Sequence, residues 1–265
     1  MIISFDSNIG GGKSTQLGIL SSKNDDNQYH IWQEELNEWI SEGWLEHFYQ
    51  DMNKFSLGFQ MRVFYSQVKR YQVEYKPLCY QRSGSHNEWL SHQRSGSNQE
   101  LLSHQRSGSN QELLSHQRSG SNQELLPHIS LNSTQPIVLC ERSPFTCHKI
   151  FGEMLVRDHL MSSLELDLCN KYNSVVGWMP DYGIYIRTSP DICYDRIQSR
   201  QRNSEKKIGF EYIRDLHEEH ERKLLEQEIF PVFSINGDRN IEEIHQDVLD
   251  GLETIKSIQA KKIIF

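Results

Sequence analysis

Short apolar runs alternate with longer amphipathic stretches along most of the chain, and this pattern predicts a parallel sheet covered by helices. The runs expected to form buried strands are Met1–Asp6, Tyr29–Trp32, Pro136–Cys140, Gly183–Arg187 and Pro231–Ile235. The stretches expected to form helices are Lys13–Ser21, Lys54–Gln72, Ser143–His159, Leu164–Asn173, Pro190–Arg200, Phe210–Glu228 and Ile241–Ala260. Five strands joined by helical crossovers make a doubly wound α/β fold, whose ligands bind beyond the carboxyl ends of the strands.

A repeat block interrupts this alternation before the third predicted strand. Residues 81–128 are four tandem copies of a twelve-residue unit, which reads QRSGSNQELLSH in its second and third copies. The unit is rich in Ser, Gly, Gln, Asn and Arg, and its leucines recur at a period that holds no fixed helical face. We expect a disordered loop inserted into one domain, with partner binding as the other interpretation. The remaining 217 residues suit a single α/β domain.

The net charge of −8 falls entirely outside the repeats, because each repeat contains one Arg and one Glu. An acidic chain lacks the basic surface that nucleic-acid binding requires, and no apolar run approaches the roughly 20 residues of a membrane span. The five cysteines show no metal-ligand spacing and fit reduced thiols. A glycine-rich motif that begins by residue 10 leaves no room for a leader peptide. We therefore expect a cytoplasmic protein that binds neither nucleic acid nor membranes.

That glycine-rich motif follows the first predicted strand and opens the first predicted helix. Residues 7–15 read SNIGGGKST, which is the P-loop pattern G-x-x-x-x-G-K-[ST] with Ser7 at the first glycine. Such a loop turns backbone N–H groups around phosphates, directs a lysine at them and places a hydroxyl on Mg²⁺. The order of strand, loop and helix favours a P-loop NTPase-type fold over a chance glycine-rich turn. The residues expected at the nucleotide are Asn8, Ile9, Gly10, Gly11, Gly12, Lys13, Ser14 and Thr15, with Ser14 also on the metal.

Polar residues follow the second and third predicted strands. Glu34 comes just after Trp32, and Glu141-Arg142-Ser143 follows the third strand. At the phosphate site a carboxylate can orient and deprotonate an acceptor hydroxyl, although an acidic run such as the one at Glu34, taken alone, fits a solvated helix start better. Gln60, Val63 and Gln67 share one helical face, and the amide of a glutamine offers a paired donor and acceptor for a base edge.

Together these features resemble the deoxynucleoside kinase family, which includes deoxycytidine, deoxyguanosine, mitochondrial thymidine and multisubstrate deoxynucleoside kinases. The resemblance covers nearly all of the non-repeat residues. Its marks are the P-loop, an E-x-x-x-x-W from Glu34 to Trp39, a tyrosine and a glutamine eleven residues apart at Tyr49 and Gln60, the E-R-S, and an arginine-rich lid. It implies transfer of the γ-phosphate of ATP, with Mg²⁺, to the 5′-hydroxyl of a deoxynucleoside in nucleotide salvage, by a homodimer.

The resemblance also implies roles for single residues. Glu34 is similar to the general base, Glu141 to the acidic residue that holds Mg²⁺, and Arg142 to the arginine beside the reacting 5′ oxygen. Lys13 would contact the transferred phosphate. Positions that enclose the base, read its edge or hold the 3′-hydroxyl are matched by Trp39, Phe59, Phe151, Gln60, Tyr49 and Glu205. Without the resemblance, Phe59 and Phe151 fit core aromatics equally well, and a surface turn and a polar helix face explain Tyr49 and Gln60 better.

The lid is expected where the helix Pro190–Arg200 ends. Arg196, Arg200 and Arg202 form the spacing R-x-x-x-R-x-R, and three guanidiniums on so short a stretch repel each other unless anions draw them in. A solvated basic helix end is the alternative. In the family such a lid closes over the phosphates and adenine of ATP.

Nucleoside choice is expected to depend on Val63, Gln67 and Cys147. Deoxycytidine and deoxyguanosine kinases place an Arg and an Asp at the last two positions, whereas this chain has neither charge there. A small Cys147 leaves room for a 5-methyl group, so we expect thymidine first and deoxycytidine next.

Two other interpretations stay open. A nucleoside monophosphate kinase of the thymidylate type shares the P-loop and a basic lid, but tends to have Asp-Arg where this chain reads Glu141-Arg142. A catalytically weak nucleotide-binding protein is suggested by Ser7, by Pro144 and by the insertion.

Overall fold

The computed structural model describes residues 1–24, 27–82, 136–202, 205 and 208–263. Nearly all of the repeat block, residues 83–128, lies outside this range, so its expected disorder stays a prediction. The compact unit that bears the fold is formed by Met1–Leu78 and Pro136–Phe265.

Five strands form one sheet in which every neighbouring pair is parallel. They are β1 (Ile2–Asp6), β2 (Tyr29–Trp32), β3 (Ile137–Glu141), β4 (Tyr182–Arg187) and β5 (Val232–Asn236). The order β2-β3-β1-β4-β5 places the strand that precedes the P-loop at the centre. Each strand end lies within one residue of its predicted place, and the doubly wound fold is confirmed.

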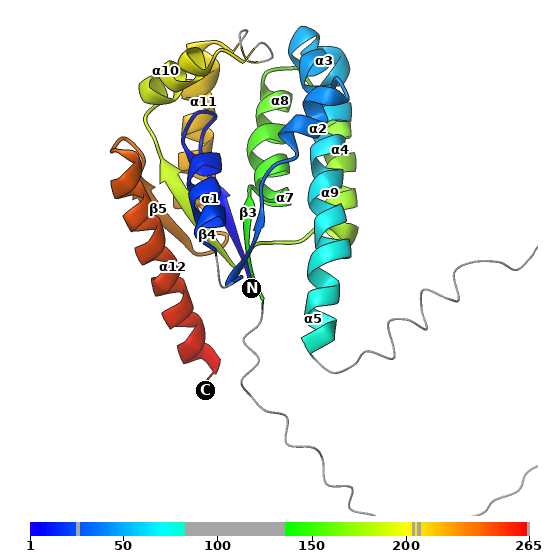
Figure 1. The fold of residues 1–265 in the computed structure, drawn as a ribbon. Helices are drawn as coiled ribbons and strands as arrows, with labels where there is room; N and C mark the ends of the chain where they lie inside the picture. The colour runs from blue at the N-terminus through cyan, green and yellow to red at the C-terminus, as the bar shows by residue number, and fades with distance from the viewer. Residues whose placement is uncertain (25–26, 83–135, 203–204, 206–207, 264–265) are drawn as a thin grey trace, which may run out of the picture. The chain divides into compact units, whose positions relative to one another are not determined.

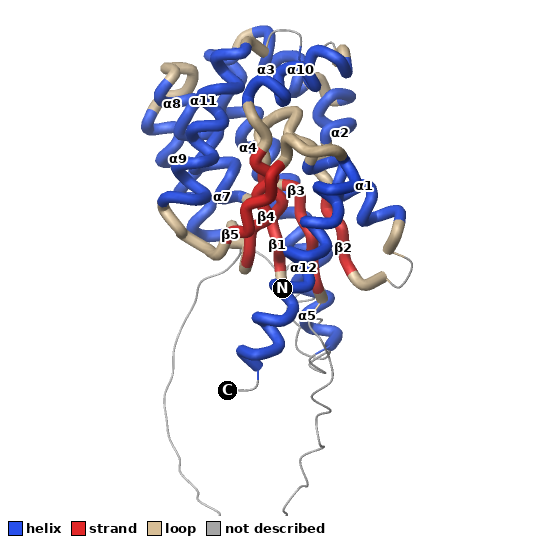
Figure 2. Tube along the Cα trace, turned by 90° about the vertical axis from the view of Figure 1, so that its left-hand side faces the viewer, coloured by secondary structure: helices blue, strands red, loops and turns tan. Residues whose placement is uncertain are grey.

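Helices cover both faces of the sheet, which is why β1 is buried throughout and consists mainly of apolar residues. On one face, α1 (Lys13–Ser22) and α12 (Ile241–Ile263) pack against alternate residues of β1 and β4, such as Ile3, Phe5 and Ile184. On the other face, Tyr185 of β4 packs with α7 (Pro144–Thr146), α8 (Glu153–Arg157) and α11 (Phe210–His220). Figure 2 shows the strands between the two groups of helices.

Three predicted long helices are interrupted by π-helical segments. The predicted Lys54–Gln72 is α4 (Met52–Arg70), followed by the π-helical Tyr71–Tyr75. The predicted Ser143–His159 contains the π-helical Cys147–Gly152 between α7 and α8, and the predicted Phe210–Glu228 continues from α11 into the π-helical Glu221–Glu226. Because the apolar pattern changes little across a π-bulge, periodicity does not reveal it.

Short helices were not predicted. These are α2 (Leu36–Ser41), α3 (Trp44–Gln50) and α5 (Lys76–Arg82). Each is at most seven residues long, which is too short for a clear helical period and too short to be stable without packing partners. The predicted helices Leu164–Asn173 and Pro190–Arg200 correspond to α9 (Ser163–Val176) and α10 (Pro190–Arg200).

The carboxyl ends of the strands point toward the edge at which α2, α3 and α10 lie (Figure 1). Within the described part of the chain, no helix has the length and apolar character needed to cross a membrane.

Candidate active site

One pocket of about 750 Å³ lies at the carboxyl edge of the sheet. The segments after all five strands contribute to its lining, as the end-of-strand rule predicts. All of the sequence-predicted site residues line it except Asn8 and Gly11. They are Ile9, Gly10, Gly12, Lys13, Ser14, Thr15, Glu34, Trp39, Tyr49, Phe59, Gln60, Val63, Gln67, Glu141, Arg142, Cys147, Phe151, Arg196, Arg200, Arg202 and Glu205.

The phosphate loop depends on glycine at two positions. Gly10 and Gly12 have φ of 82° and 101°, in the left-handed region that other residues rarely adopt. A Cβ on Gly10 would also lie 2.4 Å from the carbonyl oxygen of Cys193 in α10. The loop therefore packs directly against the helix that leads to the lid arginines.

Ser7, which departs from the P-loop pattern, is accommodated by a third glycine. The Ser7 side chain is fully buried, and its Oγ lies 3.3 Å from the carbonyl oxygen of Asn8. A Cβ on Gly11 would lie only 1.6 Å from that Oγ. The serine hydroxyl thus occupies the space that the absent side chain of Gly11 leaves open, and the loop keeps its turn.

Asn8 and Gly11 form hydrogen bonds with residues outside the loop. The Asn8 amide donates to the carbonyl oxygen of Ile213 in α11 at 2.8 Å and accepts from the Ile9 N–H at 2.8 Å. The Gly11 carbonyl accepts from the Thr188 hydroxyl at 3.0 Å. Neither residue is among the described residues that line the pocket, and their expected contact with nucleotide stays a prediction.

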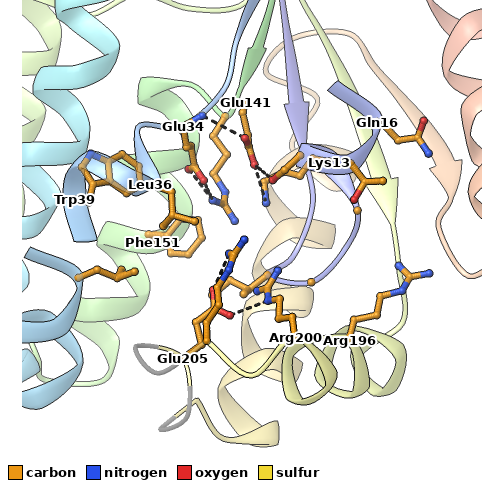
Figure 3. Close-up of a pocket in the computed structure, with 18 of the residues that line it drawn as sticks. Lys13, Gln16, Glu34, Leu36, Trp39, Glu141, Phe151, Arg196, Arg200 and Glu205 are labelled. Carbon is orange, nitrogen blue, oxygen red and sulfur yellow. Dashed lines mark hydrogen bonds and ion pairs between the residues drawn. The ribbon is translucent and has the colours of Figure 1, made fainter. Parts of the chain in front are cut away.

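Lys13 and Glu141 meet on one side of the pocket, where the start of α1 faces the end of β3 (Figure 3), and Ser14 joins them. The Ser14 hydroxyl donates to Glu141 Oε1 at 2.5 Å, and Lys13 Nζ lies 3.9 Å from the same oxygen. The other carboxylate oxygen accepts from the Glu34 N–H at 3.2 Å.

These oxygen donors fit Mg²⁺. A hydroxyl and a carboxylate converge next to the phosphate loop, and Mg²⁺ takes one or two such ligands together with waters and substrate phosphates. Among the described residues there is no cluster of three or more His, Cys, Asp or Glu side chains that would form an all-protein metal cage. An ion at Ser14 and Glu141 would thus need phosphate oxygens to complete its coordination.

Lys13 is only 5% exposed although it has a charge. Burial and the neighbouring Arg142 guanidinium lower the pKa of Lys13 from 10.5 to about 8, against the opposing effect of Glu141 and Glu34. An anion that enters the pocket would stabilise the charged form of Lys13 and raise its pKa again.

Glu34 and Arg142 form an ion pair at the centre of the pocket. Arg142 Nη1 donates to both Glu34 oxygens, at 2.7 and 2.8 Å, and the two side chains are only 15% and 11% exposed. Arg142 has a φ of 60°, and its guanidinium lies 4.8 Å from the centroid of the Phe151 ring. A strained backbone at the end of β3 therefore directs this arginine into the pocket.

An aromatic chamber continues the pocket beyond Glu34. The rings of Trp39 and Phe59 meet edge to face at a centroid distance of 5.7 Å. The buried Gln60 side chain accepts a hydrogen bond from the Cys147 thiol, with 3.0 Å between Oε1 and Sγ. Burial raises the pKa of Cys147, so this thiol stays protonated and neutral.

Gln67 lies about two helical turns along α4 from Gln60, and it also lines the chamber. Both polar atoms of its side-chain amide are buried, and neither has a hydrogen-bond partner among the described residues. A buried amide without partners costs free energy, so this donor and acceptor are available to a ligand or to water.

Two of the lid arginines point at Glu205. Arg200 Nε donates to Glu205 at 2.7 Å, and Arg202 Nη1 donates to its other oxygen at 3.3 Å. Arg196 instead donates to the carbonyl oxygen of Gly237, after β5, at 3.3 Å, and points away from Glu205 (Figure 3). The three arginines therefore line different parts of the same pocket.

Several lining residues were not among the predicted ones. At the far end of the phosphate loop they are Gln16, Ile241, Glu242 and Ile244, next to Arg239 and Asn240 of the loop after β5, which the resemblance to the family places at the adenine, and near the aromatic chamber they are Leu36 and Leu45. The position of Arg239 and Asn240 just after β5 is a signal that points to the first group. Leu36 and Leu45 belong to the unpredicted short helices, and nothing in their local sequence distinguishes them from core residues.

Comparison with known proteins bears on the chemistry of this pocket. The sequence model of the deoxynucleoside kinase family matches residues 3–88 and 114–258. The chain belongs to the deoxynucleoside kinase family. Its activity is therefore that of a phosphotransferase that acts on nucleosides in nucleotide salvage. The matched ranges leave out 89–113, which are repeat residues.

Individual relatives are viral and mammalian. The probable deoxycytidine kinase of fowlpox virus is 27% identical over 247 residues, which are 89% of this chain and 78% of that protein. Mitochondrial thymidine kinase 2 of Homo sapiens is 31% identical over 117 residues, 40% of this chain and 43% of that protein. Deoxycytidine kinase of Mus musculus is 25% identical over 144 residues, 48% and 54% of the two chains.

Proposed function

We propose that this deoxynucleoside kinase uses MgATP to phosphorylate the 5′-hydroxyl of pyrimidine deoxynucleosides, thymidine first and deoxycytidine next. The observation that supports this best is the place of Glu34. Its carboxylate lies between the phosphate loop and the aromatic chamber and accepts hydrogen bonds from Arg142. The backbone N–H of Glu34 donates to Glu141. A phosphate donor and a nucleoside bound at the two ends of this pocket would meet at Glu34.

The donor end is suited to a triphosphate. The glycines of the loop allow backbone N–H groups to surround phosphate oxygens at the start of α1, and Lys13 adds a positive charge there. Ser14 and Glu141 would hold Mg²⁺, which when bound would neutralise charge on the phosphate oxygens. Arg196, Arg200 and Arg202 would close over the phosphates from α10.

The acceptor end is suited to a nucleoside. Glu34 would accept the proton of the 5′-hydroxyl while the oxygen attacks the γ-phosphorus and the bond to the β-phosphate oxygen breaks, so that ADP leaves. Arg142 orients Glu34 and lies where charge develops on the transferred group. Tyr49 and Glu205 would hold the 3′-hydroxyl.

The chamber favours a pyrimidine. The rings of Trp39, Phe59 and Phe151 would enclose a base, and the Gln60 amide would pair with its edge. Cys147 is small and uncharged, and its thiol is hydrogen-bonded to Gln60. It would therefore leave space for the 5-methyl group of thymine. Val63 adds an apolar wall, and the unpaired amide of Gln67 can bond a second polar atom of the base.

We further propose a homodimer formed through α4 and α9, which lie side by side (Figure 1). Apolar side chains at i, i+4, i+8 and i+11 of α9 face solvent: Leu164, Leu168, Tyr172 and Val175. Leu164 and Val175 are 79% and 81% exposed, and Tyr65 of α4 is also exposed. A continuous apolar stripe of this kind is typical of a protein–protein contact.

The function is tested by offering thymidine and thymidine monophosphate separately with labelled ATP and Mg²⁺. We expect labelled thymidine monophosphate from the first and no product from the second. Product from thymidine monophosphate alone would identify a nucleoside monophosphate kinase instead. Binding of ATP without any product would identify a nucleotide-binding protein that has lost catalysis.

A further inference from the structure

Two arginines of α4, which are not among the predicted site residues, bind the segment between β2 and α3. Arg62 and Arg70 lie eight residues apart with Ser66 between them, so the three side chains share one face of α4. Of the residues of α4 that line the aromatic chamber, Gln60, Val63 and Gln67 lie on a neighbouring stripe of the helix, whereas Phe59 lies on the side of Arg62 and Ser66.

Arg62 uses all of its guanidinium nitrogens on one short stretch of chain. Its Nε and Nη2 donate to the two oxygens of Glu42 at 2.7 and 3.0 Å, Nη2 also donates to Glu38 at 3.2 Å, and Nη1 donates to Glu35 at 3.2 Å. Nη1 is also bonded to the Ser66 hydroxyl at 2.5 Å. The Arg62 side chain is only 11% exposed, so it is held in one arrangement.

Arg70 binds the other end of the same stretch. Its Nη1 donates to the carbonyl oxygen of Gln33 at 2.6 Å, and its Nε lies 3.7 Å from Glu35 Oε1. Glu35 is thus bound by one arginine on each carboxylate oxygen, and its side chain is 6% exposed. Burial opposes its charge, but hydrogen bonds from Ser66 and Arg62 and the charge of Arg70 keep the pKa of Glu35 below its usual value.

The stretch cannot hold this arrangement by itself. Helix α2 has only six residues, and Glu35 at its N-cap makes no side-chain capping bond. So short a helix is unstable without tertiary partners. Four glutamates at 34, 35, 38 and 42 also repel one another unless cations lie among them.

Two pocket residues depend on the position of this stretch. Glu34 lies between Gln33 and Glu35, and its side chain points to the opposite side, toward Arg142. Trp39, in α2, donates from its indole Nε1 to the same Ser66 hydroxyl that Arg62 binds, at 3.3 Å. A shift of the stretch would therefore move both the carboxylate proposed as general base and one wall of the chamber.

We propose that Arg62 and Arg70 are positioning residues that fix Glu34 and Trp39 for nucleoside phosphorylation, an inference that rests on the proposed function for its kinetic part. They act through the carboxylates and the carbonyl group of residues 33–42 and do not contact the substrates. The donor site is linked to this stretch by two hydrogen bonds, from the Glu34 N–H to Glu141 and from the Gln33 amide to the Ser14 carbonyl oxygen, and we expect it to depend on the two arginines less than the acceptor side does.

The test compares Arg62→Met with Arg157→Met in the full chain. Arg157 is the matched control because it also binds three carboxylates, of Asp158, Asp215 and Glu219, but on α8 and away from the pocket lining. Hydrogen exchange followed by mass spectrometry reports on backbone amides of residues 33–42, and steady-state kinetics reports on thymidine and MgATP separately.

In Arg62→Met we expect faster exchange in residues 33–42 and unchanged exchange in the phosphate loop. The kcat/KM for thymidine should fall by about tenfold to a hundredfold, as expected for a reacting group displaced by about 1 Å, while the KM for MgATP changes much less. Arg157→Met should match the wild type in both measurements. Should Arg62→Met fail to fold, Arg70→Met is measured in the same way. This variant removes the hydrogen bond to the Gln33 carbonyl oxygen and the ion pair with Glu35.

Wild-type exchange in residues 33–42 together with wild-type kinetics for thymidine would overturn the inference. So would an equal loss for thymidine and MgATP, which a general loss of folding produces. If the wild-type protein phosphorylates no deoxynucleoside, the proposed function fails, whereas the exchange measurement still decides whether the two arginines hold the segment.

Discussion

Raising the pH through 8 should weaken the binding of MgATP, because Lys13 loses its charge in the nucleotide-free protein. Burial and Arg142 lower the pKa of Lys13 from 10.5 to about 8. A depression of that size corresponds to about 3 kcal/mol of unfavourable interaction with the charged form. The phosphates of ATP reverse this effect, so the bound state takes up the proton that the free state has lost.

Calorimetric titration between pH 7 and pH 9.5, in buffers that differ in ionisation enthalpy, measures both the affinity and the proton uptake. We expect a Kd that is constant near pH 7 and weaker by about tenfold at pH 9, with close to one proton taken up per ATP there. Lys13→Arg, which stays charged, should bind with little pH dependence. A wild-type Kd that is the same at pH 7 and pH 9 would refute the reasoning.

The same pKa predicts how the stability of the nucleotide-free protein depends on pH. The folded-state pKa of Lys13 lies below the unfolded value, so the penalty is present in full below pH 8 and is relieved as the pH rises from 8 toward 10.5. Lys13→Met should therefore raise the Tm at pH 7, by an amount that corresponds to at most about 3 kcal/mol, while it removes ATP binding. A lower Tm for this variant would contradict the assigned penalty.

Three further predictions concern other parts of the pocket. Glu34→Gln should lower kcat by about a hundredfold to ten-thousandfold, as expected for loss of a general base, with ATP binding retained in the same calorimetric assay; near-normal turnover would remove Glu34 from the mechanism. Gly11→Ala should abolish ATP binding because its Cβ would overlap the Ser7 hydroxyl, and the added change Ser7→Gly should restore it; a double variant as weak as the single one would show that the two positions are independent. Deletion of residues 81–128 should leave the kcat/KM for thymidine unchanged, because the pocket-lining residues that the structure describes lie in 9–67, 141–151, 196–202, 205 and 239–244.

The sheet could be predicted from the sequence because its central strands are buried on both faces. Mainly apolar runs such as Ile2–Phe5 end where the chain leaves the core, and this sets their bounds closely. The phosphate loop could be predicted for a related reason, since Gly10 and Gly12 occupy left-handed conformations that glycine alone adopts readily.

The wall of the chamber could not be predicted in the same way. Helices α2 and α3 are short, and ion pairs with Arg62 and Arg70 hold the first of them, so their stability comes from partners that are distant in sequence. The acidic run at Glu34 fits a solvated helix start by its sequence alone. In the structure Glu34 faces Arg142 and Glu35 is buried between two arginines, so neither is fully solvated.

The hydrogen bonds that Asn8 and Gly11 make outside the loop could likewise not be predicted from the sequence. Both belong to the P-loop pattern, yet Asn8 turns toward Ile213, some 200 residues away along the chain. A motif identifies the loop as a whole, whereas the direction of each side chain depends on tertiary neighbours.

The central claim is that the pocket transfers phosphate from MgATP to a pyrimidine deoxynucleoside, and a substrate panel tests it most directly. The full chain is supplied with MgATP and, separately, with thymidine, deoxycytidine, deoxyadenosine or deoxyguanosine, and formation of each 5′-monophosphate is measured. The account predicts the highest kcat/KM for thymidine, the next for deoxycytidine, and much lower values for both purine nucleosides. A purine deoxynucleoside with the highest kcat/KM would contradict the proposed fit of Cys147, Val63 and Gln67 to a pyrimidine base.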